Sequence, residues 1–263
     1  MKIQVLVATM NQYDYSLLEK MNIQTDAIVG NQCDCNEIEY FDYQGHDIAW
    51  YSFAERGVGL NRNNTLMRAT GDIVLFADDD VVYVDGYEKI VLDYYISHPK
   101  ADVVIFNFHM KRGETSFYDR VTKEGRVTKK RATKYGTYCI SAKKDKLQFA
   151  NIYFHLNFGG GAKYSSGEDT IFLQECISKK LNVYATKLTI GILDHGDSTW
   201  FKGYNDKFFF DKGVLYYLLN RKLGGLFAVY HCIKHRKKYK TYGWYNALKQ
   251  MYRGFKHAKT YRV

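Results

Sequence analysis

Several features that mark other classes of protein are rare or missing in this sequence. Proline occurs once, at Pro99, so extended Pro-rich linkers are absent. There is no run of about 18 apolar residues, so no membrane-spanning helix is predicted. The five cysteines include no C-x-x-C pair, and Cys33-Asp34-Cys35 is too closely spaced for an ordinary structural zinc site. Reduced cytosolic thiols are therefore expected.

Acidic residues are missing from the C-terminal stretch. Residues 212–263 contain no Asp or Glu and 13 of the 38 Lys and Arg, which leaves 25 basic against 28 acidic residues elsewhere. The net charge of +10 therefore belongs to this stretch rather than to the body. Cations with interleaved aromatic side chains suit an anionic membrane surface. A solvated basic helical subdomain is the alternative, and nucleic acid is disfavoured because no recognised binding motif accompanies the charge.

Apolar periodicity predicts alternating strands and helices over the first 200 residues. The hydrophobic content of 46% argues against global disorder. The short apolar stretch 3–9 lacks a small-residue cleavage site and is predicted to be a first buried strand rather than a signal peptide. Further strands are expected at 27–30, 48–53, 73–77, 103–108, 138–142 and 182–190, with helices at 15–21, 61–69, 87–97 and 170–179. Residues 111–135 are expected to form a loop or hairpin. This alternation predicts an α/β fold with a mostly parallel sheet and helices on both faces.

The most informative motif is a run of three carboxylates, Asp78, Asp79 and Asp80, directly after the predicted strand 73–77. If the strand continues, Asp78 and Asp80 share one face and Asp79 the other. Mg²⁺ and Mn²⁺ prefer such oxygen ligands and are held by one or two carboxylates plus substrate phosphates. The sequence therefore predicts a divalent-metal site at the carboxyl end of the strand. A solvated acidic turn is the alternative.

Four ordered motifs resemble those of the family-2 glycosyltransferases with the glycosyltransferase-A fold. The resemblance covers roughly residues 1–200. It is carried by Val5-Leu6-Val7-Ala8-Thr9-Met10-Asn11, by the segment 57–64 (GVGLNRNN) with 69–72 (ATGD), by 75–81 (LFADDDV) and by Gly167-Glu168-Asp169. The expected fold is a single glycosyltransferase-A domain at 1–205, with a donor half at 1–110 and an acceptor half at 111–205. A basic aromatic helical extension is expected at 206–263.

The resemblance implies a nucleoside-diphosphate-sugar donor bound over the first half of the sheet. Thr9 and Asn11 are expected near the nucleoside, Arg62 near the nucleotide or its diphosphate, and Asp78 on the nucleoside sugar. Asp80 would carry the divalent metal, Mn²⁺ or Mg²⁺, and Asp79 is counted with the donor-binding residues.

One departure from the family pattern concerns the base of the nucleotide. The acid pair that usually follows the second strand is replaced by Gly30-Asn31-Gln32-Cys33-Asp34. Asn31 or Gln32 could hydrogen-bond a base, and Asp34 could be a displaced acid. Uridine is expected from its frequency in the family.

Glu168 and Asp169 are the candidate catalytic pair of the acceptor half. Glycosyl transfer needs a general base for the acceptor hydroxyl, and the resemblance favours Asp169 as base with Glu168 in support. Ser165-x-x-Glu168 is also a capping-box pattern, so a purely structural role is open.

Two further segments complete the expected site. Gly160, in the run Phe158-Gly159-Gly160-Gly161-Ala162, resembles the glycine-rich segment beside the donor sugar, although an ordinary flexible turn would look the same. His195 is a candidate second metal ligand and Trp200 a candidate stacking platform for an acceptor sugar. A surface loop and a core tryptophan are the respective alternatives.

Taken together, these features predict an inverting, metal-dependent hexosyltransferase. It would move galactose, glucose or an N-acetyl form from a UDP-sugar to an acceptor hydroxyl, in bacterial surface polysaccharide synthesis. We expect a cytoplasmic protein attached to the inner membrane face through its basic tail, where a lipid-linked acceptor would lie. A nucleotidyltransferase is disfavoured because Ala8-Thr9-Met10-Asn11-Gln12 lacks a glycine-rich basic phosphate loop. A non-enzymatic basic module would leave the acids of the body unexplained.

Overall fold

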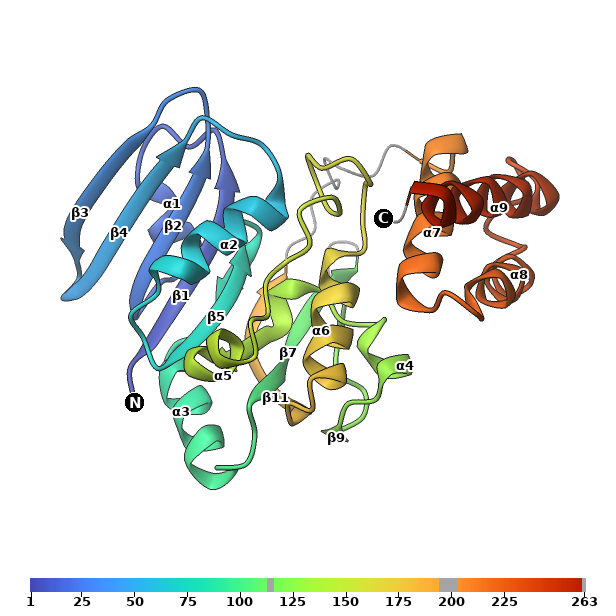
Figure 1. Cartoon of the computed structure of the whole chain (residues 1–263). Coiled ribbons are helices and arrows are strands. Elements are labelled where there is room, and N and C mark those ends of the chain that lie inside the picture. The colour runs from blue at the N-terminus through green and yellow to red at the C-terminus, as the bar shows by residue number, and fades with distance from the viewer. Residues whose placement is uncertain (113–115, 194–202, 262–263) are drawn as a thin grey trace. The chain divides into compact units, whose positions relative to one another are not determined.

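The chain forms two compact units in the computed structural model, which describes residues 1–112, 116–193 and 203–261 (Figure 1). The first unit comprises Met1–Leu156 and Glu168–Asp197, and the second comprises Asn157–Gly167 and Ser198–Val263. The segment 157–167, which we predicted to belong to the catalytic domain, thus groups with the C-terminal helices.

The first unit is built on a mixed sheet whose central strands run parallel. Strands β1 (Ile3–Met10), β2 (Asp26–Gln32), β4 (His46–Phe53) and β5 (Ile73–Asp78) pair in the order β4-β2-β1-β5. Nearly every residue of β1, β2 and β5 is buried, as expected for strands covered on both faces. The α/β fold with a mostly parallel sheet is therefore confirmed.

The sheet continues past β5 with strands of both directions. Its remaining members are β10 (Ile140–Lys143), β7 (Val103–Arg112), β11 (Val183–Leu193) and β6 (Val81–Tyr83) in that order, with β8 (Ser116–Asp119) paired to β7 and β9 (Gly125–Arg126) paired to β11. Because β10 is antiparallel to both β5 and β7, β7 runs in the same direction as β5. The β7–β8 pairing confirms a hairpin within the region 111–135.

Two helices near the start of the chain set the position of a ligand crevice. Helix α1 (Ser16–Lys20) links β1 to β2 in one direction across the sheet, and α2 (Val58–Arg68) links β4 to β5 in the other. Right-handed crossovers in opposite directions place such helices on opposite faces; α2 crosses in front of the sheet in Figure 1. The direction of the crossovers therefore changes between the neighbouring strands β1 and β5. In open α/β sheets, ligands bind in the crevice beyond the carboxyl ends of the two strands at such a point.

The other helices of the first unit are α3 (Tyr87–Ser97), α4 (Lys129–Ala132), α5 (Lys144–Phe149) and α6 (Glu168–Ser178). Two local features differ from the predictions. Strand β3 (Glu37–Tyr43) was not predicted, because it is an antiparallel edge strand with mostly exposed side chains and no apolar run. The predicted strand 138–142 begins with a 3₁₀ turn over Thr137–Cys139 before β10.

The second unit contains the helices α7 (Asp206–Leu219), α8 (Gly224–Lys234) and α9 (Trp244–Tyr261). Helices α7 and α9 cross at two glycines. A methyl group on Gly213 would lie 1.9 Å from the carbonyl oxygen of Met251, and one on Gly254 would lie 1.9 Å from that of Phe210. The two backbones are therefore in direct contact. No helix among the described residues is long and apolar enough to cross a membrane.

Replacing Gly213 with alanine is expected to destabilise the second unit by about 3 kcal/mol, because the added methyl group overlaps the backbone of α9 and forces the helices apart. Chemical denaturation followed by circular dichroism measures this change. Gly225→Ala is the matched control, since nothing lies within 4 Å of its added methyl group and alanine favours a helix by about 0.5–1 kcal/mol over glycine. Equal stability of the two variants would contradict the close crossing.

Candidate active site

The candidate site lies where the parallel strands end at the reversal of strand order. In the registers of the sheet, Thr9 of β1 is paired with Asn31 of β2, and Ala8 of β1 with Asp78 of β5. The strands thus bring three of the predicted donor-binding residues to one edge. These side chains differ in exposure: Thr9 and Asn31 are buried, whereas Asp78 is partly exposed.

The three carboxylates do not continue the strand. Strand β5 ends at Asp78, and Asp79 and Asp80 form a turn before β6, so the predicted alternation of faces does not apply to them. The side chain of Asp79 turns back to β1, where it accepts a 2.6 Å hydrogen bond from Thr9 Oγ1. Burial raises the pKa of Asp80, and the charges of Asp78 and Asp79 add to it, bringing it to about 7. A negative charge at Asp80 is therefore poorly accommodated by protein atoms alone.

Arg62 joins the strand end to the start of α6. Its guanidinium donates from Nη2 to Asp78 Oδ1 at 2.5 Å and from Nη1 to Glu168 Oε1 at 3.2 Å, although the two acids lie far apart in sequence. The side chain of Arg62 is only 5% exposed and lies 5.4 Å from the ring centroid of Phe154. Burial lowers its pKa, but the charges of Asp78 and Glu168 outweigh burial, so the net pKa is raised. With both terminal nitrogens engaged, Arg62 orients the two carboxylates.

Helix α6 presents its two acids in its first turn, and it begins at Glu168 rather than at the predicted Thr170. Glu168 is therefore too early in the helix to complete a capping box with Ser165, and its carboxylate bonds to Arg62 instead. Asp169 accepts a 2.7 Å hydrogen bond from the backbone N–H of Thr170, and its charge contributes to the raised pKa of Arg62. The structure thus brings Asp78, Arg62, Glu168 and Asp169 into one charged cluster.

Gln12 is a residue of the site that the sequence analysis did not single out. Its Nε2 donates to Thr9 Oγ1 at 2.9 Å. Its backbone N–H and C=O bond to the side-chain amide of Asn31, each at 3.0 Å. Asn31 therefore holds the turn after β1, in which Asn11 adopts a left-handed φ of 53°. The run Thr9-Met10-Asn11-Gln12, two polar residues beyond a strand end, was the available signal.

The segment after β2 differs from the expected base-reading pair. Gln32 is buried and its Oε1 accepts a 2.8 Å hydrogen bond from the backbone N–H of Gly57. Asp34 points into solvent and forms a 2.9 Å ion pair with Arg56. Neither side chain is held in a position that identifies a base.

Three further residues were predicted to belong to the site. Gly160 belongs to the second unit, within a loop in which Gly159 and Gly161 take φ values of 107° and 76° and the backbone of Gly159 bonds to Tyr164. The glycine run is thus a tight, hydrogen-bonded turn. His195 and Trp200 lie outside the described residues.

A divalent cation fits the carboxylate run on chemical grounds. Among the residues that the structure describes, no three His, Cys, Asp or Glu side chains form a group that could hold a metal ion by themselves. Magnesium and manganese sites of nucleotide enzymes instead use one or two carboxylates and draw the remaining oxygens from phosphates and water. Asp80, with its raised pKa and its two acidic neighbours, has the donor chemistry that such a site needs.

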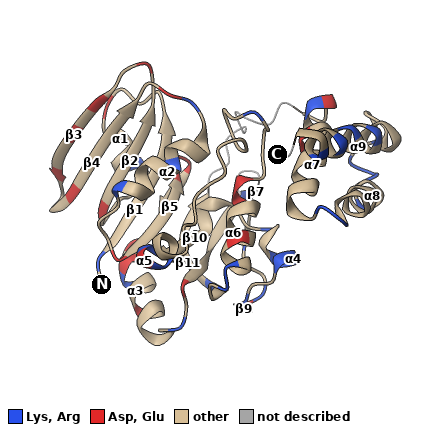
Figure 2. Cartoon of the chain, viewed as in Figure 1, with Lys and Arg blue, Asp and Glu red and all other residues tan. Residues whose placement is uncertain are grey.

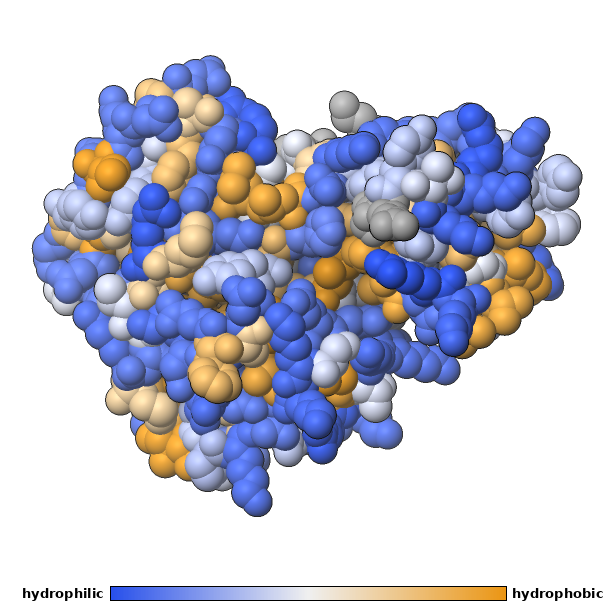
Figure 3. Space-filling model, in the orientation of Figure 1, coloured by the Kyte–Doolittle hydropathy of each residue, from blue (hydrophilic) through white to orange (hydrophobic). Residues whose placement is uncertain are grey.

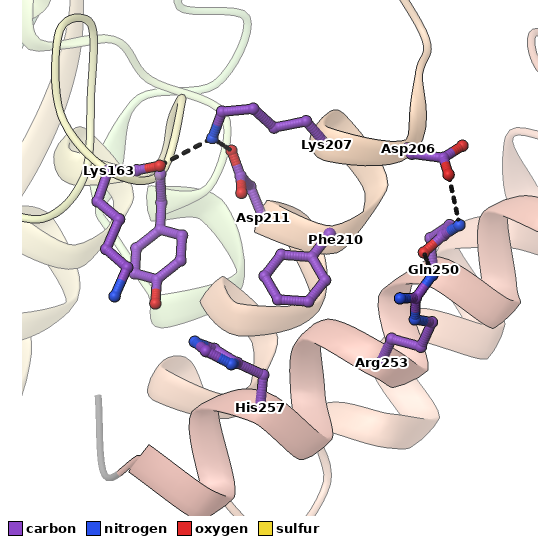
Figure 4. A pocket seen from close by; sticks show the side chains of 9 residues that line it. Lys163, Asp206, Lys207, Phe210, Asp211, Gln250, Arg253 and His257 are labelled. Carbon is purple, nitrogen blue, oxygen red and sulfur yellow. Dashed lines mark hydrogen bonds and ion pairs between the residues drawn. The ribbon is translucent and has the colours of Figure 1, made fainter.

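A pocket of about 420 Å³ lies within the second unit, and none of its lining residues was a predicted site residue (Figure 4). Its polar side chains bond largely to one another. Lys207 Nζ donates to the carbonyl oxygen of Lys163 and to Asp211 Oδ2, both at 2.8 Å, and Gln250 Nε2 donates to Asp206 Oδ2 at 2.7 Å. These contacts connect α7 to α9 and to the 157–167 loop, so we assign the pocket a structural role.

Comparisons with known proteins concern the family and the fold of the chain. Residues 34–159 match the family model described as glycosyl transferase family 2. A search of curated proteins finds no match. The solved structure of S. aureus TarS 1–349 in complex with UDP-GlcNAc is similar, with a TM-score of 0.60 and 18% identity over 84% of this chain and 67% of that one.

Two further TarS structures have similar scores. The UDP complex of the same fragment has a TM-score of 0.59 and 18% identity, over 84% of this chain and 66% of that one. A longer TarS chain gives the same score and identity, but this chain spans only 40% of its length. At such identity the likeness establishes the fold. The family match over residues 34–159, together with this fold, supports a family-2 glycosyltransferase.

Proposed function

We propose that the protein is an inverting glycosyltransferase that moves a hexose from a UDP-sugar to an acceptor hydroxyl. The observation that carries this proposal is the contact of Arg62 with both Asp78 and Glu168, because it joins the strand end expected to hold the donor to the acids expected to meet the acceptor. The TarS complex with UDP-GlcNAc supports a uridine donor and makes N-acetylglucosamine the first sugar to test.

The proposed roles follow from the contacts. Thr9 and Asp79 stabilise each other beside the nucleoside site, with Asn11 in the turn next to them and Asn31 of β2 holding that turn. Glu168 is held by Arg62, which suits a residue that orients its neighbours, whereas Asp169 is our proposed base for the acceptor hydroxyl. Asp80 would hold the divalent metal, with His195 as a proposed second ligand. A bound cation would neutralise charge developing on the leaving diphosphate.

We further propose that the acceptor is a membrane-linked saccharide of a bacterial surface polysaccharide. Trp200 is the proposed stacking platform for it, and Gly160 a proposed neighbour of the donor sugar. The basic second unit would attach the protein to the anionic inner face of the membrane. Its absence of acidic residues after Asp211 supports that location.

A donor panel tests the proposed reaction directly. We expect UDP, in the presence of Mn²⁺, to bind more tightly than GDP, CDP or dTDP, and a UDP-hexose to be hydrolysed slowly without an acceptor. Calorimetry measures binding, and chromatography of released UDP measures hydrolysis. Formation of a nucleotide sugar from UTP and a sugar 1-phosphate, with no hydrolysis of any nucleotide sugar, would instead identify a nucleotidyltransferase.

A further inference from the structure

Helix α8 buries its small side chains and exposes its large apolar ones. Gly224, Ala228 and Cys232 recur every four residues and are buried. The opposite side carries large apolar side chains that are between 40% and 65% exposed: Leu223, Leu226, Phe227, Val229, Tyr230 and Ile233, which we call the α8 apolar face. Figure 3 shows the corresponding hydrophobic patch over α8. An amphipathic helix of a water-facing bundle has the reverse arrangement.

The close packing of α8 explains why these side chains remain outside. A methyl group on Gly224 would lie 2.3 Å from the carbonyl oxygen of Tyr216 and 2.8 Å from the ring of Phe255. Small residues are therefore needed where α8 meets α7 and α9, and there is no room there for a large side chain. The apolar side chains that the helix does carry have no place in the bundle interior. A contiguous exposed apolar face of this kind marks an interaction surface.

Helix α9 is also basic and exposes Trp244, Tyr245 and Tyr252, but its periodic apolar stripe is buried within the second unit. Ala247, Met251 and Ala258 are fully buried, and Gly254 touches the backbone of α7. Met251 and Ala247 belong to the same apolar cluster as Phe209 of α7. The periodic pattern of α9 therefore stabilises the second unit itself.

The charges around α8 indicate which kind of surface its apolar face contacts. Arg221 and Lys222 come directly before the helix and Lys234 ends it, and all three are exposed. The segment that follows adds the exposed cations Arg236, Lys237, Lys238 and Lys240. Figure 2 shows Lys and Arg, without Asp or Glu, along α8 and α9. Cations at both ends of an apolar face match a surface that has anionic headgroups above acyl chains.

We propose that α8 is the element that enters an anionic membrane interface. Its apolar face would lie among the upper acyl chains, at a depth of about 5–10 Å, while the flanking cations contact the headgroups. This inference deepens the membrane attachment proposed above by naming the helix responsible, and it does not depend on the sugar-transfer reaction.

Vesicle binding by the full chain tests this role of α8. We expect sedimentation with vesicles of phosphatidylcholine and phosphatidylglycerol, weaker sedimentation with phosphatidylcholine alone, and loss of binding at high salt. Leu226→Asp should lower the partition coefficient by more than about tenfold, because it removes an apolar side chain and adds an anion at the interface. Ile96→Asp is the matched control, since Ile96 of α3 is 66% exposed and Leu226 is 65% exposed. Its binding should equal that of the unaltered chain.

Three outcomes would overturn the proposal. Leu226→Asp could bind vesicles as the unaltered chain does, or both aspartate variants could lose binding equally. Alternatively, the chain could ignore vesicles and form a dimer that Leu226→Asp dissociates, which would make the α8 apolar face a protein interface. Donor hydrolysis by the same samples separates the two proposals. Hydrolysis without vesicle binding refutes only the role of α8, and vesicle binding without hydrolysis refutes only the proposed reaction.

Discussion

Asp169→Asn is expected to lower kcat for sugar transfer by about a thousandfold while donor binding is retained. The amide keeps the shape of the side chain and can still accept the hydrogen bond from the backbone N–H of Thr170, but it cannot take the proton of an acceptor hydroxyl. Because Asp169 lies in the first turn of α6 and the donor is expected at the strand ends, the Kd for UDP should change little. Steady-state kinetics and calorimetry on the same preparation separate these two effects.

Two variants accompany this experiment. Asp145→Asn changes another acid in the first turn of a helix, α5, and should leave kcat unaltered. Glu168→Gln removes the charge that faces Arg62, so it should weaken the cluster and reduce both stability and kcat. Activity of Asp169→Asn equal to that of the unaltered enzyme, with a large loss in Glu168→Gln, would transfer the role of base to Glu168.

Asp80→Asn is expected to weaken Mn²⁺-dependent UDP binding by about 100-fold. A metal held by Asp80 would add to the affinity for UDP only while that carboxylate is charged. The variant should also make UDP affinity nearly independent of Mn²⁺. Calorimetric titrations with Mn²⁺ and with a chelator measure both effects.

Asp93→Asn is the control for this titration, because Asp93 is an exposed acid of α3 that pairs with its neighbour Lys89 one helical turn away. It should keep the metal dependence of the unaltered enzyme. UDP binding by Asp80→Asn that still responds fully to Mn²⁺ would exclude Asp80 as the ligand. Asp78 would then need the same test.

The buried part of the fold could be predicted because its pattern is local. Strands β1, β2 and β5 are apolar on both faces and are bounded by polar residues, so their runs stand out in the sequence. Strand β3 has no such run, since it pairs only with β4 at the sheet edge and exposes most of its side chains. Its existence depends on a neighbour rather than on its own composition.

The candidate site was predicted as a set of residues rather than as an arrangement. Asp78, Arg62 and Glu168 were all selected, but the pairing of one guanidinium with two acids from different elements is a tertiary contact that no local pattern encodes. The hydrogen bond from Thr9 to Asp79 is another tertiary contact that no local pattern encodes. Alternation of faces over residues 78–80 required the strand to continue through Asp80, but it ends at Asp78 and Asp79 turns to Thr9.

In the C-terminal helices, too, the local pattern could be predicted but the tertiary contacts could not. The sequence predicts basic, aromatic helices, and the structure has them. Which apolar side chains are exposed depends on the glycine contacts at Gly213, Gly224 and Gly254, where backbones meet too closely for any side chain. The sequence analysis assigned membrane attachment to the basic stretch as a whole and did not separate α8 from α9.

In the proposed reaction, the position of Arg62 would make donor and acceptor binding energetically dependent on each other. A ligand that draws Asp78 away from the guanidinium leaves more of its positive charge to Glu168, so the first binding event changes the field at the second. Thermodynamic reciprocity then requires the acceptor to alter donor affinity by the same factor as the donor alters acceptor affinity. A single buried cation would thus give the proposed transferase a physical basis for cooperative binding of its two substrates.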